Sequence, residues 1–371
     1  MRLLISGYYG MGNLGDEAVL AGLLGELRRQ APDWQVKVLS GNPAATEKQH
    51  GVVAVPRASL RSVFRAMREA DIVVSGGGGL FQDATSLRSL LYYAGVLHLA
   101  RLARKRTAIL AQSIGPLRTG LARRLTATAA EKADLVTVRD EPSAALLRSI
   151  GVRCPVEVTA DPAFLVEPDA SAAAGPAEMA LCLRTWPGGQ DAVGAVVEGV
   201  GRWLAEEGGT ALVLPFQSPQ DDAVAGQAAA RLGDRARIVP LYGHPGLAAA
   251  IMTKVQVVVG ARLHALILAS SAAVPWVGLA YDPKVQGLAS AVGLLALAPE
   301  GLTPEGVQAA LSALWRERER VRAALLDALP RWKDLARRNV ELLLRIGHAE
   351  PAAEAARSSE RSASAGEDED A

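Results

Sequence analysis

Short apolar segments alternate with longer segments of helical periodicity along most of this chain. In the first half the apolar segments are 3–9, 36–41, 71–77, 106–115 and 135–140. Segments with apolar residues at helical spacing separate them, at 16–30, 59–70, 89–105 and 143–150. Strands that are apolar on both faces and alternate with helices are typical of a parallel sheet covered on each side. The alternation therefore predicts an α/β fold with a doubly wound sheet.

A second alternating set follows a break in the pattern. The break, EPDASAAAGPAE at 167–178, is rich in Pro, Gly, Ser and Ala and is typical of a linker. Beyond it we expect strands within 179–184, 210–216, 237–241, 255–260 and 274–281, with helices between them. A chain of 371 residues is also too long for one small core. The sequence therefore predicts two Rossmann-like domains, at 1–166 and 179–302.

Two doubly wound domains place the carboxyl ends of both sheets across one cleft, where open α/β sheets bind ligands. This element order is that of the GT-B fold of glycosyltransferases, so we expect a GT-B-like architecture, although fold analogy selects no reaction. Residues 303–348 form an amphipathic helical segment that we expect to pack back onto the first domain. The tail at 349–371 is rich in Ala, Ser, Glu and Asp and is predicted to be disordered.

Composition narrows the class of function. A net charge of +1 and an aromatic content of 4% argue against nucleic acid as a partner. Cys154 and Cys182 lack metal-ligand spacing and are interpreted as buried thiols in a reducing cytoplasm. No signal peptide or apolar run of spanning length is present, so we expect a cytoplasmic protein. The basic run 101–106 is either a solvated helix face or a peripheral contact with the inner face of the plasma membrane.

The first candidate binding segment is GYYGMGNLGDEAVL at 7–20, directly after the first predicted strand. Glycines such as Gly12 let the backbone approach a ligand closely. The glycine spacing differs from the dinucleotide-binding fingerprint, and Asp16 would repel a phosphate at this helix start. Asn13 and Asp16 therefore either cap the helix or bind the hydroxyl groups of a sugar.

The second candidate segment is SGGGGLFQDATSLRSL at 75–90, which also follows a predicted strand. Its glycines, Gly78 among them, leave no side chain between the backbone and a ligand. Gln82 and Asp83 then supply neutral and acidic hydrogen-bonding groups. This set suits a polyhydroxylated sugar better than a phosphate, and a glycine turn without a ligand is the alternative. We therefore expect the first domain to hold an acceptor sugar.

The segment VQVVVGARLHALILASS at 255–271 places two polar side chains in an apolar run. The strand ends at Gly260 and a helix begins near Leu263, so Arg262 and His264 can both face the cleft. A guanidinium, an imidazole and the backbone N–H groups of a helix start together form an anion site. A half-buried histidine with satisfied hydrogen bonds is the alternative interpretation.

Further cations lie at other predicted strand ends, at Arg139, Arg184 and Lys284. Arg139 is followed by two acidic residues, so an internal ion pair is the alternative to a role in binding. Gln217 and Asp221 either reach the cleft or cap the next helix. The chain lacks a P-loop, an HExxH zinc motif, a cysteine cluster and a GxSxG elbow. The cations facing glycine-rich loops indicate a small phosphorylated donor and a sugar acceptor.

These segments together resemble the polysaccharide pyruvyl transferase family and, within it, the bacterial cell-wall CsaB type. The matching segments run in order over 1–290: GYYGMGNLGDEAVL, GGGGLFQDATSLRSLLYY, QSIGPL, VRDEPS, DPAF, LRTW, LPFQSPQD, GARLHALILA and YDPKV. The resemblance implies transfer of pyruvate from phosphoenolpyruvate onto a sugar as a 4,6-ketal, with no cofactor or required metal. For the cell-wall type it implies a lipid-linked disaccharide ending in N-acetylmannosamine, whose polymer anchors S-layer proteins.

The family's Arg-Leu-His motif matches residues 262–264, and its Leu-Arg and Val-Arg-Asp elements match Arg184 and Arg139. Ala261 departs from the methionine frequent in relatives. We expect His264 to be the general acid/base and Arg184 and Arg262 to clamp the donor.

On this hypothesis Arg139 and Lys284 neutralise the departing phosphate, and Gly260 contributes to donor binding in the second domain. Asn13, Asp16 and Asp83 orient or deprotonate the acceptor hydroxyls. Two alternatives remain open: a nucleotide-sugar glycosyltransferase on the same fold, and a glycan-binding protein without catalysis. The sequence also leaves open whether the protein forms a homo-oligomer.

Overall fold

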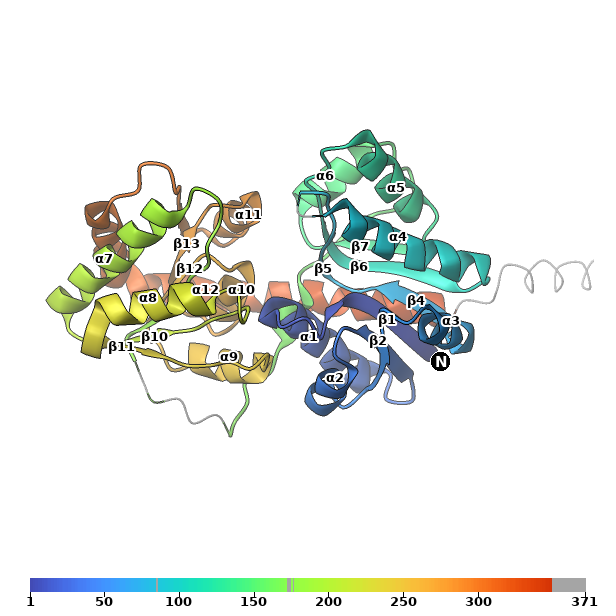
Figure 1. The fold of residues 1–371 in the computed structure, drawn as a ribbon, viewed down its shortest axis with the longest axis horizontal. Helices are drawn as coiled ribbons and strands as arrows, with labels where there is room; N and C mark the ends of the chain where they lie inside the picture. The colour runs from blue at the N-terminus through green and yellow to red at the C-terminus, as the bar shows by residue number, and fades with distance from the viewer. Residues whose placement is uncertain (85, 172–174, 176, 349–371) are drawn as a thin grey trace, which may run out of the picture.

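The computed structural model describes residues 1–348 except 85, 172–174 and 176. They form two parallel sheets with helices on both faces, so the predicted α/β fold is confirmed (Figure 1). The first sheet has the order β3-β2-β1-β4-β6-β7-β8, with β5 paired to β6. The second has the order β11-β10-β9-β12-β13-β14. In each sheet the chain starts in the middle and winds to both sides, so the carboxyl ends of all strands share one edge.

The first sheet and its helices occupy the half of the chain before residue 166. The strands are β1 (Arg2–Tyr9), β2 (Gln35–Ser40), β3 (Val53–Pro56), β4 (Ile72–Ser75), β5 (Gly78–Phe81), β6 (Arg106–Ile114), β7 (Leu135–Val138) and β8 (Glu157–Val158). The helices are α1 (Leu14–Gln30), α2 (Pro43–His50), α3 (Leu60–Glu69), α4 (Leu87–Leu102), α5 (Gly120–Glu131), α6 (Glu141–Ser149) and the 3₁₀ helix η1 (Pro162–Leu165). Helix α2 was not predicted, because its sequence PAATEKQH has no apolar stripe and buries only Thr46 and His50.

The second sheet lies within 179–297. Its strands are β9 (Met179–Cys182), β10 (Ala211–Val213), β11 (Ala236–Ile238), β12 (Val257–Gly260), β13 (Trp276–Leu279) and β14 (Leu295–Leu297). Its helices are α7 (Gln190–Glu207), α8 (Asp222–Leu232), the 3₁₀ helix η2 (Gly233–Arg235), α9 (Pro245–Met252), α10 (Leu263–Ser271) and α11 (Pro283–Val292). Parts of the predicted linker and the whole predicted tail lie outside the described residues.

One long helix, α12 (Pro304–His348), runs behind both sheets (Figure 1). Its start packs into the core of the second sheet through Val307, and its end packs into the core of the first through Leu343. Asn339 is fully buried and donates to the carbonyl oxygen of Ala160 at 3.0 Å. The hydroxyl group of Thr159 donates to the Asn339 amide oxygen at 2.9 Å. These hydrogen bonds fix the helix against the carboxyl end of the first sheet.

The two halves also touch directly near the start of α1. The N–H of Leu14 donates to the carbonyl oxygen of Phe216 at 2.9 Å, and Asn13 forms an isolated antiparallel bridge with Gln217. A small apolar cluster joins α1, η1, α10 and α12, and its buried members are Ala18, Ala160, Ala163, Phe164, Ile267 and Ala336. This packing holds the carboxyl ends of the two sheets opposite each other.

Candidate active site

His264 lies in the first turn of α10 and points toward the first domain. Its Nε2 atom lies 3.4 Å from a carboxylate oxygen of Asp161 and, among the described residues, forms no hydrogen bond. On the other side of the ring, a methyl group placed on Gly15 would lie 2.2 Å from Nδ1. Only a glycine at this position of α1 allows the imidazole to come so close. The ring is therefore held between the start of α1 and a buried carboxylate.

Asp161 precedes η1 and links His264 to Arg139. Its carboxylate accepts from the guanidinium of Arg139 at 2.6 Å and from the N–H of Ala163 at 2.9 Å. Burial raises the pKa of Asp161, but the charges of His264 and Arg139 and the hydrogen bond from the Ala163 N–H outweigh it and hold this pKa well below its usual value. Arg139 therefore forms an internal ion pair, which was the alternative to a binding role. Its short contact is with Asp161 and not with either of the acidic residues that follow it in the sequence. The adjacent Asp140 lies farther away, at 3.8 Å.

The glycines after β4 bring Asp16 and Lys284 close to the same place. A methyl group on Gly78 would lie 2.9 Å from the Oδ1 atom of Asp16, and one on Gly79 would lie 2.9 Å from the Nζ atom of Lys284. Gly78 also has φ of +108°, which favours glycine. Lys284 follows Asp282, whose carboxylate accepts from the Lys284 N–H and caps α11. A cation of the second domain thus reaches the glycine loop of the first.

The charges in this region act on one another. Burial lowers the pKa of Lys284, and the positive charge of Arg139 lowers it further. Burial and the neighbouring Glu17 raise the pKa of Asp16 to about 7, against the opposing effect of Arg139. The site therefore holds two cations that repel each other and a carboxyl group that can exchange a proton near neutrality.

Arg262 turns away from His264 into its own domain. Its Nε donates to Asp221 at 2.9 Å, one terminal nitrogen donates to the second oxygen of Asp221, and the other donates to Gln217 at 3.0 Å. Asp221 is 1% exposed and Arg262 is 8% exposed. The structure thus does not bring Arg262 and His264 together as one anion site. Arg262 ties the loop after β10 to the start of α10, and both Gln217 and Asp221 serve this contact.

Arg184 lies beyond β9, at the same edge of the second sheet, and is partly exposed. Its guanidinium donates to the hydroxyl group of Tyr281 at 2.9 Å and lies 5.0 Å from the centre of that ring. Tyr281 stacks on Trp186, with ring centres 5.0 Å apart. Burial raises the pKa of Tyr281, so its hydroxyl group stays protonated and can accept from Arg184. The aromatic pair holds the arginine while leaving part of it exposed.

The remaining predicted residues have local roles as well. Asn13 caps α1 by accepting from the N–H of Gly15, and its amide nitrogen donates to Asp16 at 2.6 Å. Asp83 accepts from the N–H groups of Arg118 and Thr119, at 2.7 and 2.8 Å. Its oxygens therefore position the loop before α5. Gln82 follows β5 and is half-buried, and Gly260 ends β12 and is buried.

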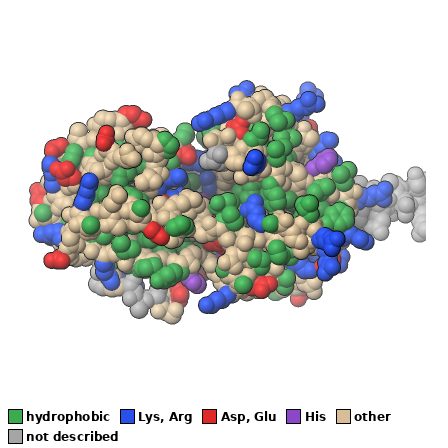
Figure 2. All heavy atoms as spheres, viewed as in Figure 1, with side chains coloured by type: hydrophobic (Ala, Val, Ile, Leu, Met, Phe, Trp, Pro, Cys, Tyr) green, Lys and Arg blue, Asp and Glu red, His purple; other side chains and the backbone are tan. Residues whose placement is uncertain are grey.

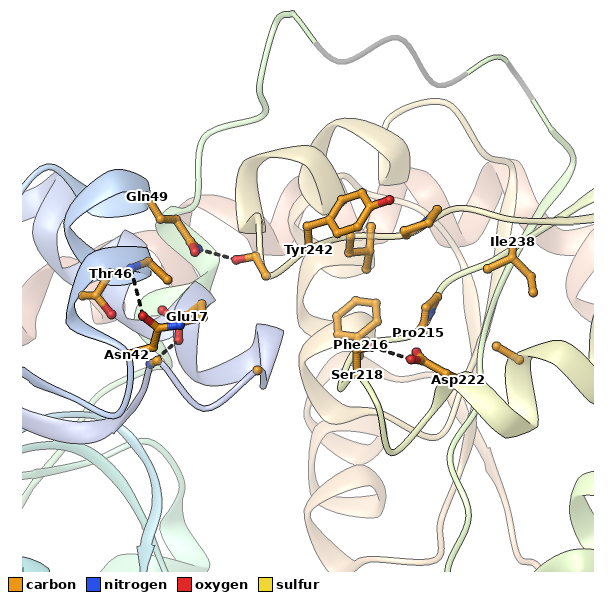
Figure 3. A pocket seen from close by; sticks show the side chains of 17 residues that line it. Glu17, Asn42, Thr46, Gln49, Pro215, Phe216, Ser218, Asp222, Ile238 and Tyr242 are labelled. Atoms are coloured by element: carbon orange, nitrogen blue, oxygen red, sulfur yellow. Dashed lines mark hydrogen bonds between the residues drawn. The ribbon is translucent and has the colours of Figure 1, made fainter. Parts of the chain in front are cut away.

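A cavity of 440 Å³ lies beside the Asn13–Gln217 bridge, between the two domains (Figure 3). Asn42 and Gln49 line it from α2 and the turn before it, and Phe216, Ser218 and Tyr242 line it from the second domain. The Gln49 side chain donates to the carbonyl oxygen of Gly243 across it. The complete lining is Gly10, Gly12, Glu17, Asn42, Ala45, Thr46, Gln49, Pro215, Phe216, Ser218, Asp222, Ala225, Ile238, Pro240, Leu241, Tyr242 and Gly243. No Lys or Arg is among these described residues.

Solved structures with the same architecture define the class of fold. Staphylococcus aureus MnaA in complex with UDP aligns with a TM-score of 0.66 at 13% identity, covering 94% of this chain and 98% of that one. The UDP-GlcNAc 2-epimerase of Neisseria meningitidis aligns with a TM-score of 0.62 at 12% identity, covering 93% and 100%. Anabaena HepE in complex with UDP and glucose aligns with a TM-score of 0.60 at 15% identity, covering 93% of this chain and 99% of that one. The protein therefore has the predicted GT-B-like fold.

Comparison of the sequence with family profiles shows the family. The profile of the family described as polysaccharide pyruvyl transferase matches residues 13–283, which include His264, Asp161 and the glycine-rich loop after β4. A comparison with curated proteins finds no match. The chain belongs to the polysaccharide pyruvyl transferase family, so it is a transferase, and the resemblance noted in the sequence is confirmed at that level.

Asp161 and Tyr281 were not among the predicted site residues. Asp161 begins the segment DPAF, which contributed to the family resemblance, and it follows the last strand of the first sheet. The available signal was therefore the carboxylate at the start of this segment, directly before Pro162. For Tyr281, the only signal was its place directly before the Asp-Pro start of α11.

Proposed function

We propose that the protein transfers the enolpyruvyl group of phosphoenolpyruvate to a sugar of a cell-wall polysaccharide precursor, forming a 4,6-ketal and releasing phosphate. The acceptor in this proposal is the terminal N-acetylmannosamine of a lipid-linked disaccharide, and the polymer anchors S-layer proteins. The observation that carries the donor assignment is that Arg139 and Lys284 lie close enough to repel each other, and that Arg139 shares the carboxylate of Asp161 with His264. A carboxylate or phosphate bound there would relieve the repulsion, which is the behaviour expected of an anion site.

The proposed reaction begins with protonation of the donor. His264, in its protonated form, gives a proton to the methylene carbon of phosphoenolpyruvate, which becomes a methyl group. An acceptor hydroxyl oxygen bonds to the central carbon and loses its proton to a base, for which we assign Asp16. With a pKa of about 7, Asp16 is a carboxylate in a large fraction of molecules near neutrality. One proton is thus added to carbon and one is taken from oxygen.

The second half of the proposed reaction exchanges phosphate for the second hydroxyl group. The bond from the central carbon to the phosphate oxygen breaks, and its electron pair leaves with the phosphate. Lys284 and Arg139 stabilise that negative charge, and Arg184 holds the carboxylate of the donor. The second sugar hydroxyl then bonds to the same carbon and gives its proton to the departing phosphate, which closes the ketal ring. Asp161 keeps the imidazole of His264 oriented throughout.

In this proposal Arg262 positions the site instead of clamping the donor. Its three side-chain nitrogens already donate to Asp221 and Gln217. The ion pair holds the start of α10, from which His264 projects. The cavity lined by Asn42, Gln49 and Tyr242 contains no cation, so it suits an uncharged sugar unit of the acceptor better than the donor.

The test is an assay of the purified protein with phosphoenolpyruvate and a disaccharide ending in N-acetylmannosamine. We expect phosphate release only when both substrates are present, and mass spectrometry should show the acceptor gaining C₃H₂O₂. In a parallel reaction a nucleotide sugar should give no transfer. Transfer from the nucleotide sugar without any response to phosphoenolpyruvate would support a glycosyltransferase instead. Acceptor binding without turnover of either donor would support a glycan-binding protein.

A further inference from the structure

Helices α3 and α4 present an exposed apolar surface on one side of the first domain. They pack side by side on the same face of the first sheet, burying Val63, Met67 and Val96. Their outward positions nevertheless carry large apolar side chains with high exposed fractions: Leu60 (80%), Phe64 (51%), Leu91 (45%), Leu99 (41%) and Leu102 (68%). A shallow depression between the helices is lined by Phe64, Arg68, Ala103 and Lys105. These five exposed side chains, with the arginines described next, are called the α3–α4 face.

Six exposed arginines surround the apolar side chains: Arg61, Arg65, Arg68, Arg88, Arg101 and Arg104. Among the described residues, none of the six forms an ion pair with an acidic side chain. The segments 57–68 and 84–106 contain no Asp or Glu, and Glu69 pairs with Lys37. Since the whole chain carries a net charge of only +1, the positive charge is concentrated here. Figure 2 shows hydrophobic side chains with Lys and Arg at their margins over this part of the first domain.

The face differs from other exposed helices of the protein. On α12 the exposed basic side chains Arg316, Arg320 and Arg322 alternate with Glu317 and Glu319, which is the pattern of a solvated helix. On α3, by contrast, Leu60 and Phe64 form one outward stripe beside a stripe of arginines, and the one acid of this helix, Glu69 at its end, pairs with Lys37. Where α3 and α4 meet, positive charge and exposed apolar area therefore occur together, unlike on this part of α12.

We propose that the α3–α4 face docks on the surface of a bilayer that contains anionic lipids. The arginines match the negative headgroups, and the leucines and Phe64 are placed to enter the boundary between headgroups and acyl chains. A second copy of this chain does not fit, because an isologous contact would set six arginines against six arginines. Among the described residues no helix has the length and apolarity to span a bilayer, so this contact would be peripheral. The proposal does not depend on which donor the active site uses.

The test is sedimentation of the purified protein with vesicles of phosphatidylcholine alone or mixed with phosphatidylglycerol. We expect binding to the mixed vesicles that weakens with added salt, and much weaker binding to phosphatidylcholine. Neutralising three arginines, in R61Q/R65Q/R68Q, should weaken binding by on the order of 100-fold, since each basic residue contributes about fivefold. The matched control R316Q/R322Q/R331Q removes the same charge from α12 and should bind like the wild type.

A second variant tests the apolar part. L60S/F64S keeps every charge, and it should reduce binding to the mixed vesicles, above all at high salt. Phosphate release with a water-soluble acceptor should be unchanged in both α3 variants, so loss of vesicle binding is distinguishable from failure of the proposed reaction. No binding of the wild type to mixed vesicles, or equal loss in the α12 control, would overturn the proposal. Equally strong binding to a DNA duplex, unchanged in L60S/F64S, would overturn the proposal in favour of a nucleic-acid-binding surface.

Discussion

The imidazole of His264 and the carboxylate of Asp161 face each other across the boundary between the two domains, with Nε2 and Oδ2 3.4 Å apart. Asp161 belongs to the end of the first sheet and His264 to the first turn of α10. The same carboxylate accepts from Arg139 at 2.6 Å. A cation, an anion and a titratable ring are thus placed in contact by segments that are far apart in the sequence.

Replacing Asp161 with asparagine should impair both activity and stability. Without its charge the imidazole loses its orienting partner, and we expect kcat to fall on the order of 100-fold. Arg139 would also lose a buried partner, so the free energy of unfolding should fall by about 3–5 kcal/mol. The matched variant His264→Gln should lose similar activity while keeping the Arg139–Asp161 pair and most of the stability. Combining both should add little further loss of kcat, and fully multiplicative losses would show that the two residues act separately.

Gly15→Ala should displace the imidazole. The new methyl group would lie 2.2 Å from Nδ1 of His264, so either the ring or α1 must move. A misplacement of this kind can lower kcat on the order of 100-fold. The control is Gly25→Ala on the same helix, where the added methyl group meets no atom within 4 Å. That variant should keep full activity and gain about 1 kcal/mol of stability. Equal activity of the two variants would contradict the placement of His264.

The pKa of Asp16, about 7, predicts two pH dependences of opposite direction. As the base, Asp16 must be ionised, so kcat should rise with pH through about 7. Stability should change the other way. The folded protein holds this proton more tightly than the unfolded chain, so the free energy of unfolding should fall by about 4 kcal/mol between about pH 4 and pH 7.

Asp16→Asn separates these two effects. It removes the buried charge, so its melting temperature should exceed that of the wild type above about pH 7 and approach it near pH 4. Its activity should be lost at every pH. Thermal denaturation followed across that range, with kcat measured in parallel, checks both. A variant that stays active, or that gains no stability at high pH, would remove Asp16 from its role as the base.

The Arg262–Asp221 pair should behave as a structural unit. Either Arg262→Ala or Asp221→Ala leaves a buried charge without its partner and should lower the free energy of unfolding by about 3–5 kcal/mol. The double variant should lose clearly less than the sum, because both charges are then gone. Denaturant unfolding of the four proteins measures this coupling. If Arg262 clamps the donor, Arg262→Ala should instead raise the KM for phosphoenolpyruvate while Asp221→Ala does not.

The fold, and the position of His264 and Lys284 at the carboxyl edge of the second sheet, could be predicted from local sequence patterns. Each of them follows an apolar strand that ends at a glycine or a turn, and parallel strands end at one edge. β5 was missed because its residues, 78–81, belong to the glycine-rich segment 75–90, which was interpreted as a binding loop. This strand forms through pairing with β6 and contacts with α1, which a periodic pattern does not contain.

The partners within the site could not be predicted in the same way. Whether Arg262 clamps a ligand or pairs with Asp221 depends on how the loop after β10 folds back, 41 residues away in sequence. Arg139 had two acidic neighbours, yet its closest carboxylate is Asp161. Tertiary packing decides which carboxylate each arginine contacts, because each acidic residue has a charge suited to pairing with it.

In the proposed mechanism, His264 protonates the methylene carbon of an enolpyruvyl donor held between the two domains. The most direct test of this step is the reaction of the purified protein with phosphoenolpyruvate and acceptor in D₂O, with the ketal product analysed by mass spectrometry and NMR. We predict one solvent deuterium in the methyl group of the ketal, and ketal formation slower on the order of 100-fold with His264→Gln. A product without solvent deuterium in that methyl group, or full activity of His264→Gln, would contradict the account.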